Sequence, residues 1–154
     1  MFDEFKELLS IFNARGVRYV VVGGYAVSLH AQPRSTQRID ILIAADMGNA
    51  GAVFAALREF GAPLEGLTPN DFAERGKFFR MDRAPVAVDL LVEIDGVDFE
   101  RAWRNRIEAT IDPSTGLKAF FLSREDLIAN KAASGRPQDV ADAAALRKAR
   151  ETGN

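Results

Sequence analysis

The chain has 154 residues, the length of one ordinary domain, and can bury a core without disulfides or a structural metal. Its net charge of −2 and its 27% charged residues are typical of a globular protein and exclude a generic polyanion binder, so any contact with nucleic acid must be local. The absence of cysteine excludes a disulfide framework, a thiolate metal site and a thiol nucleophile.

The sequence carries no pattern of a membrane protein. Its longest apolar run, residues 19–27, is too short to span a bilayer, and the N-terminal segment is acidic and amphipathic rather than basic and then apolar. We therefore expect a cytoplasmic protein with no membrane partner.

The first half of the chain alternates helical and strand patterns. Apolar residues at helical spacing are followed by a glycine, and a β-branched run is broken by Gly23-Gly24 before a short helix that Pro33 ends. A second strand and a helix follow, so the alternation favours an α/β or α+β sheet. The predicted elements are a helix over 2–14, a strand over 17–22, a helix over 25–32, a strand over 39–44 and a helix over about 47–60.

The second half predicts two hairpins followed by two helices. The first hairpin has a four-residue connection, residues 82–85, and Ser123 with Asp126 starts the first of the C-terminal helices. The predicted elements are strands over 77–82 and 86–94, a short helix over 99–104, strands over 106–112 and 117–122, and helices over 124–134 and 138–151. We therefore predict an α+β fold, a small mixed, partly antiparallel sheet flanked by helices. It forms one domain over 1–154, with a core over about 1–122 and a C-terminal helical segment over about 123–151.

The pair Gly23-Gly24 has the outline of a phosphate site. It lies between a buried strand and a helix, where glycine lets the backbone approach a ligand and the helix N–H groups point toward it. The alternative is a plain tight turn.

Aspartates on two predicted strands form a candidate metal site. Position 38 and Asp40 are two residues apart on one strand and so share a face, and Asp89 lies in an otherwise apolar run. Carboxylates that converge in this way bind Mg²⁺, and two such ions would align a hydroxyl with the α-phosphate of a nucleotide and stabilise the departing pyrophosphate. For Asp89 the alternative is a carboxylate that faces solvent from an edge strand.

The segment VVGGYAVSLHAQPRSTQRIDILI resembles the signature of DNA-polymerase-β-like nucleotidyltransferases. The resemblance is to the small bacterial branch of minimal nucleotidyltransferases and AbiEii-type toxins, in which a glycine turn precedes Arg-x-Thr-x-Asp-Ile-Asp. The segment LSREDLIANKAASGRPQDVAD resembles the C-terminal signature of the same family. The matching residues are Gly23, Gly24, Arg34, Thr36, Asp40, Asp89, Lys131, Arg136, Asp139 and Asp142.

The resemblance implies a nucleotidyltransferase-like core that transfers a nucleoside monophosphate from an NTP, with Mg²⁺, to a hydroxyl of RNA, a protein or a small molecule. RNA or a cognate protein of a toxin–antitoxin pair would be the partner. In this scheme Asp40 and Asp89 bind metal and the remaining groups contact the nucleotide, Thr36 mainly by bracing its loop. The alternative for the basic groups is a solvated surface position. The nucleotide-contacting residues are Gly23, Gly24, Arg34, Thr36, Lys131 and Arg136.

Arg38 stands where the family pattern has its first metal-binding aspartate. With Asp40 and Asp89 it gives the presumed site a charge of −1, where the pattern would give −3, so Mg²⁺ should bind poorly. A guanidinium can instead pair with a carboxylate bidentately and replace the cation. We therefore expect an inactive or impaired enzyme. The alternatives are a non-catalytic nucleotide-binding or toxin–antitoxin partner protein and, for Arg38 itself, a side chain that faces solvent.

Overall fold

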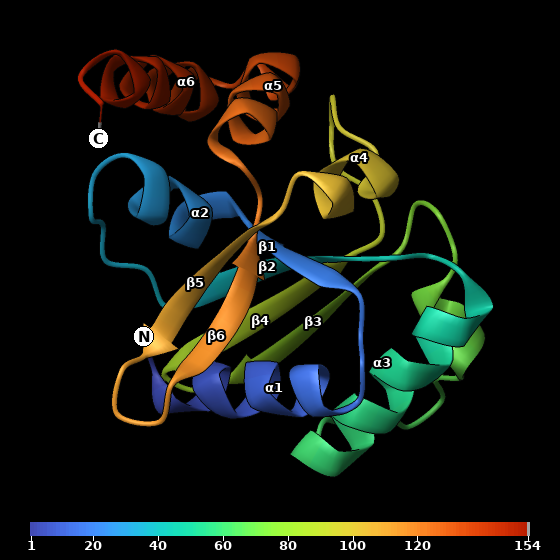
Figure 1. The fold of residues 1–154 in the computed structure, drawn as a ribbon. Helices are drawn as coiled ribbons and strands as arrows, with labels where there is room; N and C mark the ends of the chain where they lie inside the picture. Colours follow the sequence, from blue (N-terminus) through green and yellow to red (C-terminus); the bar gives the residue numbers. More distant parts are fainter. Residues whose placement is uncertain (154) are drawn as a thin grey trace.

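The computed structural model describes residues 1–153 of the chain, and within them six strands form one sheet in the order β3-β4-β2-β1-β6-β5 (Figure 1). The elements are α1 (Asp3–Ala14), β1 (Tyr19–Val22), α2 (Gly23–His30), β2 (Arg38–Ile43), α3 (Met47–Phe60), the 3₁₀ helix η1 (Pro69–Phe72), β3 (Phe78–Arg83), β4 (Val86–Leu91), α4 (Phe99–Arg104), β5 (Ile107–Asp112), β6 (Leu117–Phe121), α5 (Arg124–Ser134) and α6 (Pro137–Glu151).

The sheet is mixed and open, as the sequence predicts. Strand β1 is antiparallel to β2 and parallel to β6, and β2 is parallel to β4. The β3–β4 and β5–β6 pairs are the two antiparallel hairpins. The predicted α+β fold class is confirmed.

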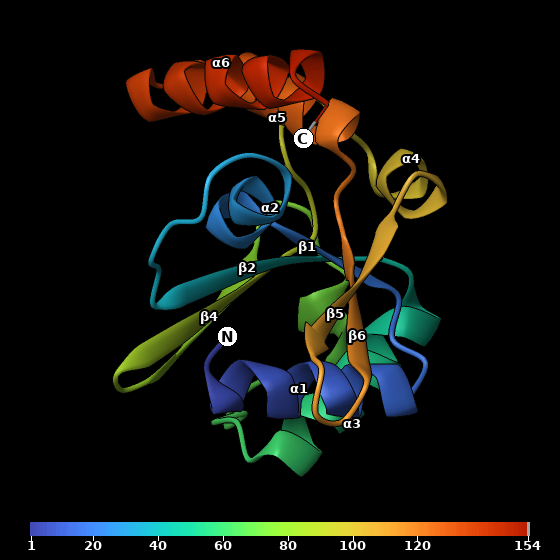
Figure 2. The ribbon, with the colours of Figure 1, turned by 60° about the vertical axis from the view of Figure 1, so that its left-hand side comes forward.

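Helices cover both faces of the sheet. Helices α1 and α3 lie on one side, and α2, α4, α5 and α6 lie on the other (Figures 1 and 2). Residues alternate between these layers along each strand: Tyr19 and Val21 pack with α1 and α3, whereas Val20 and Val22 pack with the opposite helices. Full burial of such a side chain contributes about 1.5–3 kcal/mol, so this alternation fixes which residues of each strand face the second layer.

The same alternation places charged side chains on the α2 face. In β2, Ile39, Ile41 and Ile43 pack toward α1 and α3, so Arg38 and Asp40 point the other way. In β4, Val88 and Leu90 pack with the α1 layer, which leaves Asp89 on the opposite face. The sheet thus presents two carboxylates on one face.

Two predicted boundaries are wrong in ways that matter to this face. The first helix after β1 begins at Gly23 rather than after the glycine pair, because Gly23 adopts a φ of +66° that lets the chain turn directly from strand into helix. The first hairpin has a connection of only Ala84-Pro85, because β3 continues to Arg83. Two strands are also shorter than predicted: β1 covers 19–22 instead of 17–22, and β4 covers 86–91 instead of 86–94.

Helices α5 and α6 stack on each other beyond one end of the sheet (Figure 1). The side chain of Ser123 accepts a hydrogen bond from the Asp126 N–H, as the predicted capping pattern requires, and Gly135 ends α5 in the left-handed conformation. No helix within residues 1–153 is long and apolar enough to cross a membrane.

Candidate functional site

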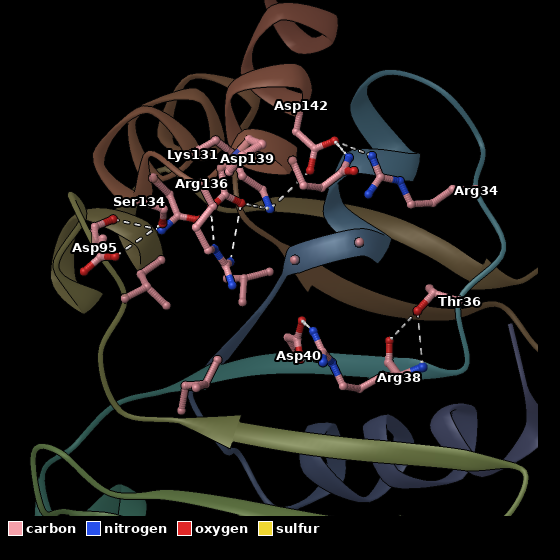
Figure 3. A pocket seen from close by; sticks show the side chains of 18 of the residues that line it. Arg34, Thr36, Arg38, Asp40, Asp95, Lys131, Ser134, Arg136, Asp139 and Asp142 are labelled. Carbon is pink, nitrogen blue, oxygen red and sulfur yellow. Dashed lines mark hydrogen bonds and ion pairs between the residues drawn. The ribbon is translucent and has the colours of Figure 1, made fainter.

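A cleft of about 760 Å³ lies between the α2 face of the sheet and helices α2, α5 and α6 (Figure 3). It brings together residues that the sequence places far apart, from the glycine turn to the last helices. The sequence-predicted residues that line it are Gly23, Gly24, Arg34, Thr36, Arg38, Asp40, Lys131 and Arg136. Asp89 lies beside Asp40 beneath this lining, because Asp40 and Asp89 are register partners on the parallel strands β2 and β4.

The glycine turn packs against Asp40. Val22 pairs with Asp40 across β1 and β2, which brings the next residue, Gly23, onto the carboxylate. A Cβ atom at Gly23 would overlap Asp40 Oδ2 and would lie 3.1 Å from its Cγ atom. Glycine is therefore needed at position 23 both for its φ of +66° and for this close approach.

Arg38 pairs with both carboxylates, and so does not point away into solvent. Its Nε atom donates to Asp40 Oδ1 at 2.9 Å and its Nη2 atom to Asp40 Oδ2 at 3.3 Å (Figure 3). The same Nε atom lies 3.6 Å from Asp89 Oδ2. The predicted salt bridge between Arg38 and the carboxylates is present, and 53% of the Arg38 side chain remains exposed.

Arg80, which the sequence reading missed, holds the second carboxylate. Its Nε and Nη2 atoms donate to the two oxygens of Asp89 at 2.7 and 2.8 Å. Arg38, Asp40, Arg80 and Asp89, called here the sheet cluster, carry two positive and two negative charges. The cluster is therefore neutral, rather than −1 as predicted. The signal was available: a two-residue turn at Ala84-Pro85 places Arg80 opposite Asp89.

The environment of the sheet cluster shifts two pKa values. Burial raises the pKa of Asp40, and the hydrogen bonds and charge of Arg38 only partly offset this effect. The bidentate pair with Asp89 raises the pKa of Arg80, which therefore stays protonated at every relevant pH. The solvent-facing alternative for Asp89 is excluded, because β4 is an inner strand and Asp89 is 6% exposed.

A second group of charges joins the C-terminal helices to the loop before β2. Arg34 Nη2 donates to Asp142 Oδ1 at 2.5 Å, and Lys131 Nζ lies 3.2 Å from Asp139 Oδ1 and 3.4 Å from Asp142 Oδ2. Arg136 Nε donates to Asp139 Oδ2 at 2.7 Å (Figure 3). These five residues are called here the helix cluster.

The helix cluster is more deeply buried than the sheet cluster. Asp139 and Asp142 are 1% and 3% exposed. The hydrogen bond from Arg136 lowers the pKa of Asp139 against the effect of burial. Burial by itself raises the pKa of Asp142, but the hydrogen bonds from Arg34 and Gln138 and nearby positive charge outweigh it and lower that pKa. Both carboxylates therefore stay ionised.

Thr36 braces the chain between these clusters. Its hydroxyl accepts a hydrogen bond from the Arg38 N–H at 3.3 Å and lies 3.2 Å from the Arg38 carbonyl oxygen. Gly24 lies under the same loop, because a Cβ atom there would be 3.6 Å from Thr36 Cγ2. The loop is thereby held over the glycine turn.

The sheet cluster does not fit a magnesium ion in this arrangement. Mg²⁺ binds carboxylate oxygens in a near-octahedral shell, and a guanidinium paired with the same oxygens competes with it by charge and by position. All four oxygens of Asp40 and Asp89 accept hydrogen bonds from Arg38 or Arg80. Among residues 1–153 there is no group of three or more Asp, Glu or His side chains placed to hold a metal.

Three solved structures share this fold at low sequence identity. The lincomycin-bound lincosamide antibiotic adenylyltransferase LnuA has a TM-score of 0.60 and 17% identity, with 96% of each chain covered. ANT(2'')-Ia in complex with adenylyl-2''-tobramycin has a TM-score of 0.59 and 16% identity, covering 97% of this chain and 87% of its own. An antigenic nucleotidyltransferase-like protein from Paracoccidioides brasiliensis has a TM-score of 0.56 and 18% identity, covering 96% of this chain and 75% of its own. The fold is that of nucleotidyltransferases.

The family is shown by sequence as well. A family model described as nucleotidyltransferase of unknown function (DUF6036) matches residues 1–148, and the chain belongs to this family. A search of curated protein sequences gave no match.

Proposed function

We propose that the chain binds a nucleoside triphosphate in the cleft without a divalent cation, and that it does not transfer the nucleotidyl group. The observation that carries this proposal is the position of Arg38, whose guanidinium lies between the two carboxylates and lines the cleft. A fixed positive charge thus occupies the place where the family pattern has a metal ligand.

Arg38 remains able to bind a phosphate while it is held by Asp40. A guanidinium has five N–H groups, and Asp40 accepts from two of them, which leaves three for a ligand. Because the pair with Asp40 fixes the orientation of the side chain, little entropy is lost when an anion binds. Arg38 would therefore act as a preorganised phosphate ligand.

Other groups support a polyphosphate at the same end of the cleft. The first turn of α2, which begins at Gly23, leaves backbone N–H groups without intrahelical acceptors and favours negative charge. The helix cluster has three positive and two negative charges, and 34% of the Arg34 side chain and 78% of the Arg136 side chain are exposed. These arginines supply positive charge near the turn without a bound cation.

Loss of transfer follows from loss of electrostatic stabilisation. Phosphoryl transfer depends on cations placed where charge develops on the transferred and leaving groups. In the sheet cluster the positive charge belongs to guanidiniums that are paired with Asp40 and Asp89, so it is partly neutralised before a nucleotide arrives. The paired guanidiniums can therefore still bind a nucleotide, but they do not lower the barrier to nucleotidyl transfer.

Nucleotidyl transfer is the second candidate, favoured by the family description and by two of the similar structures, the adenylyltransferase LnuA and the complex of ANT(2'')-Ia with adenylyl-2''-tobramycin. The acceptor would be a hydroxyl of a small molecule, RNA or a protein. If the chain is instead non-catalytic, it would act as a nucleotide-binding protein or as one partner of a toxin–antitoxin pair. The cleft itself favours neither kind of acceptor, but Arg38 favours binding over transfer.

A transfer assay separates the two candidates. Purified protein is incubated with α-labelled ATP, CTP, GTP or UTP, Mg²⁺, and pooled tRNA, cell protein or small polyhydroxylated compounds as acceptors. We expect no label on any acceptor, while fluorescence-detected NTP binding is retained and falls about tenfold or more in the Arg38→Ala variant. Label transferred by the unmodified chain would contradict the proposal. So would NTP affinity that is unchanged in Arg38→Ala.

A further inference from the structure

The geometry points to Arg80 as a second and independent block to divalent cations at the sheet cluster. We infer that an aspartate at position 38 does not by itself reopen a metal site, and that removal of Arg80 is also required. This inference rests on the proposed function because it concerns the same carboxylates. Its test, however, measures metal binding alone and does not require a nucleotide.

Arg80 reaches Asp89 from across the hairpin. The antiparallel register of β3 and β4 places Arg80 directly opposite Asp89, where side chains on the same face are close neighbours. The resulting pair is bidentate, at 2.7 and 2.8 Å, and uses both oxygens of Asp89. Arg38 approaches Asp89 only to 3.6 Å, so Arg80 is the main partner of this carboxylate.

The burial of Asp89 makes this pair hard to open. Its side chain is 8% exposed, and a carboxylate that far from water requires a charged or hydrogen-bonding partner. The Arg80 side chain is 49% exposed, and its guanidinium lies 5.9 Å from the Phe78 ring centroid. Arg80 is therefore the exposed partner of a buried carboxylate, and an ion that binds Asp89 has to compete with it.

The two arginines block different carboxylates. Arg38 engages both oxygens of Asp40, and Arg80 engages both oxygens of Asp89. An Arg38→Asp variant would have three carboxylates and one guanidinium, with both oxygens of Asp89 still hydrogen-bonded to Arg80. An ion at this site would then have to compete with the charge and the bidentate hydrogen bonds of Arg80 for Asp89.

The test is a titration with Mn²⁺ in the absence of nucleotide, in which free Mn²⁺ is measured by electron paramagnetic resonance. Four chains are compared: unmodified, Arg38→Asp, Arg80→Gln and the double variant. Lys118→Gln, which removes a cation that is 57% exposed and paired with Glu108, is the matched control. Circular dichroism and thermal unfolding confirm that each variant is folded.

We expect no Mn²⁺ binding in the unmodified chain, in Arg80→Gln and in the control. Arg38→Asp should bind weakly, and the double variant about tenfold or more tightly than Arg38→Asp, since two charge-assisted hydrogen bonds no longer compete with the ion. Mn²⁺ should also raise the unfolding temperature of the double variant. Equal affinities of Arg38→Asp and the double variant would overturn the inference.

A further double variant covers the case in which the loss of Arg80 prevents folding. Arg38→Asp with Arg80→Lys keeps a positive charge beside Asp89 but lacks the bidentate fork, and we expect it to bind Mn²⁺ more tightly than Arg38→Asp alone. Equal binding would again contradict the role of Arg80. Failure of the unmodified chain to bind NTP would instead contradict the proposed function and leave the order of Mn²⁺ affinities unaffected.

Discussion

The sheet cluster and the helix cluster both pair aspartates with basic side chains at the same cleft, yet only the helix cluster has a buried cation at its centre. In the sheet cluster the guanidiniums of Arg38 and Arg80 are about half exposed, at 53% and 49%. In the helix cluster Lys131 is nearly as buried as its carboxylate partners, with side-chain exposures of 11% for Lys131 and 2% for Asp139.

This difference indicates that the sheet cluster can bind a ligand, whereas the centre of the helix cluster stabilises the fold. Exposed guanidiniums that are held at one edge keep donors for a ligand, whereas a buried lysine between two buried carboxylates has its charge committed within the protein. The helix cluster joins α5, α6 and the loop before β2, and it thereby shapes one wall of the cleft. Arg38 and Asp40 of the sheet cluster line the floor of the cleft, where they would meet an incoming ligand.

The largest expected effect comes from the centre of the helix cluster. Lys131→Met should lower the free energy of unfolding by about 3 kcal/mol, because it leaves the buried carboxylates of Asp139 and Asp142 with one charged partner each, Arg136 and Arg34. Urea denaturation measures the change. The control Lys118→Met removes an exposed lysine and should stay within about 0.5 kcal/mol. Similar small losses in both variants would show that the helix cluster is not a brace.

Substitution of Gly23 in the glycine turn tests the contact between the end of β1 and the sheet cluster. Gly23 and Gly16 have φ values of +66° and +67°, so alanine strains the backbone equally at both positions. Only at Gly23 does the new Cβ atom meet Asp40, whereas nothing lies within 4 Å at Gly16. We expect Gly23→Ala to cost about 1–2 kcal/mol more than Gly16→Ala in urea denaturation, and to weaken NTP binding. Equal losses, with NTP affinity intact, would contradict the packing described here.

A smaller effect concerns pH, with opposite signs for the two clusters. The lowered pKa of Asp142 adds stability that is present above about pH 4, near the unfolded value, and is lost as the pH falls through the lower folded value. The raised pKa of Asp40 acts oppositely: folded Asp40 takes up its proton first, so its contribution to stability decreases as the pH rises from about 4 through the folded value.

Unfolding free energies measured from about pH 2 to 6 test these signs. Asp142→Asn should flatten the loss of stability below about pH 4, whereas Asp40→Asn should remove the gain that Asp40 provides as the pH falls toward that value. Identical profiles for Asp142→Asn and Asp40→Asn would contradict the assignment of opposite shifts.

Local rules predicted most of the fold and three of the four residues of the sheet cluster, all except Arg80. The period of two along β2 was enough to place Arg38 and Asp40 on one face, because the intervening residue, Ile39, is fully buried on the other. The helix over 47–60 and the short helix over 99–104 were predicted with their observed bounds, and in the structure an aspartate caps the N-terminus of each.

The remainder depends on contacts that no local pattern encodes. The pairing of Arg80 with Asp89 required the correct length of one turn, and the predicted four-residue connection shifts that register. The pairing of Arg34 with Asp142 joins residues 108 positions apart, and only the packing of α6 beside α2 brings them together. Sequence signatures identified both residues separately but did not indicate that they neutralise each other.

The measurement that tests the central claim most directly is the ratio of NTP dissociation constants with and without Mg²⁺, determined by isothermal titration calorimetry in excess EDTA and in excess Mg²⁺. If Arg38 supplies the cation, the two constants should agree within about twofold, because the protein offers no free carboxylate to a metal–nucleotide complex. An affinity that rises about tenfold or more with Mg²⁺ would contradict the account. It would mean that the carboxylates of Asp40 and Asp89 bind a metal despite their arginine partners.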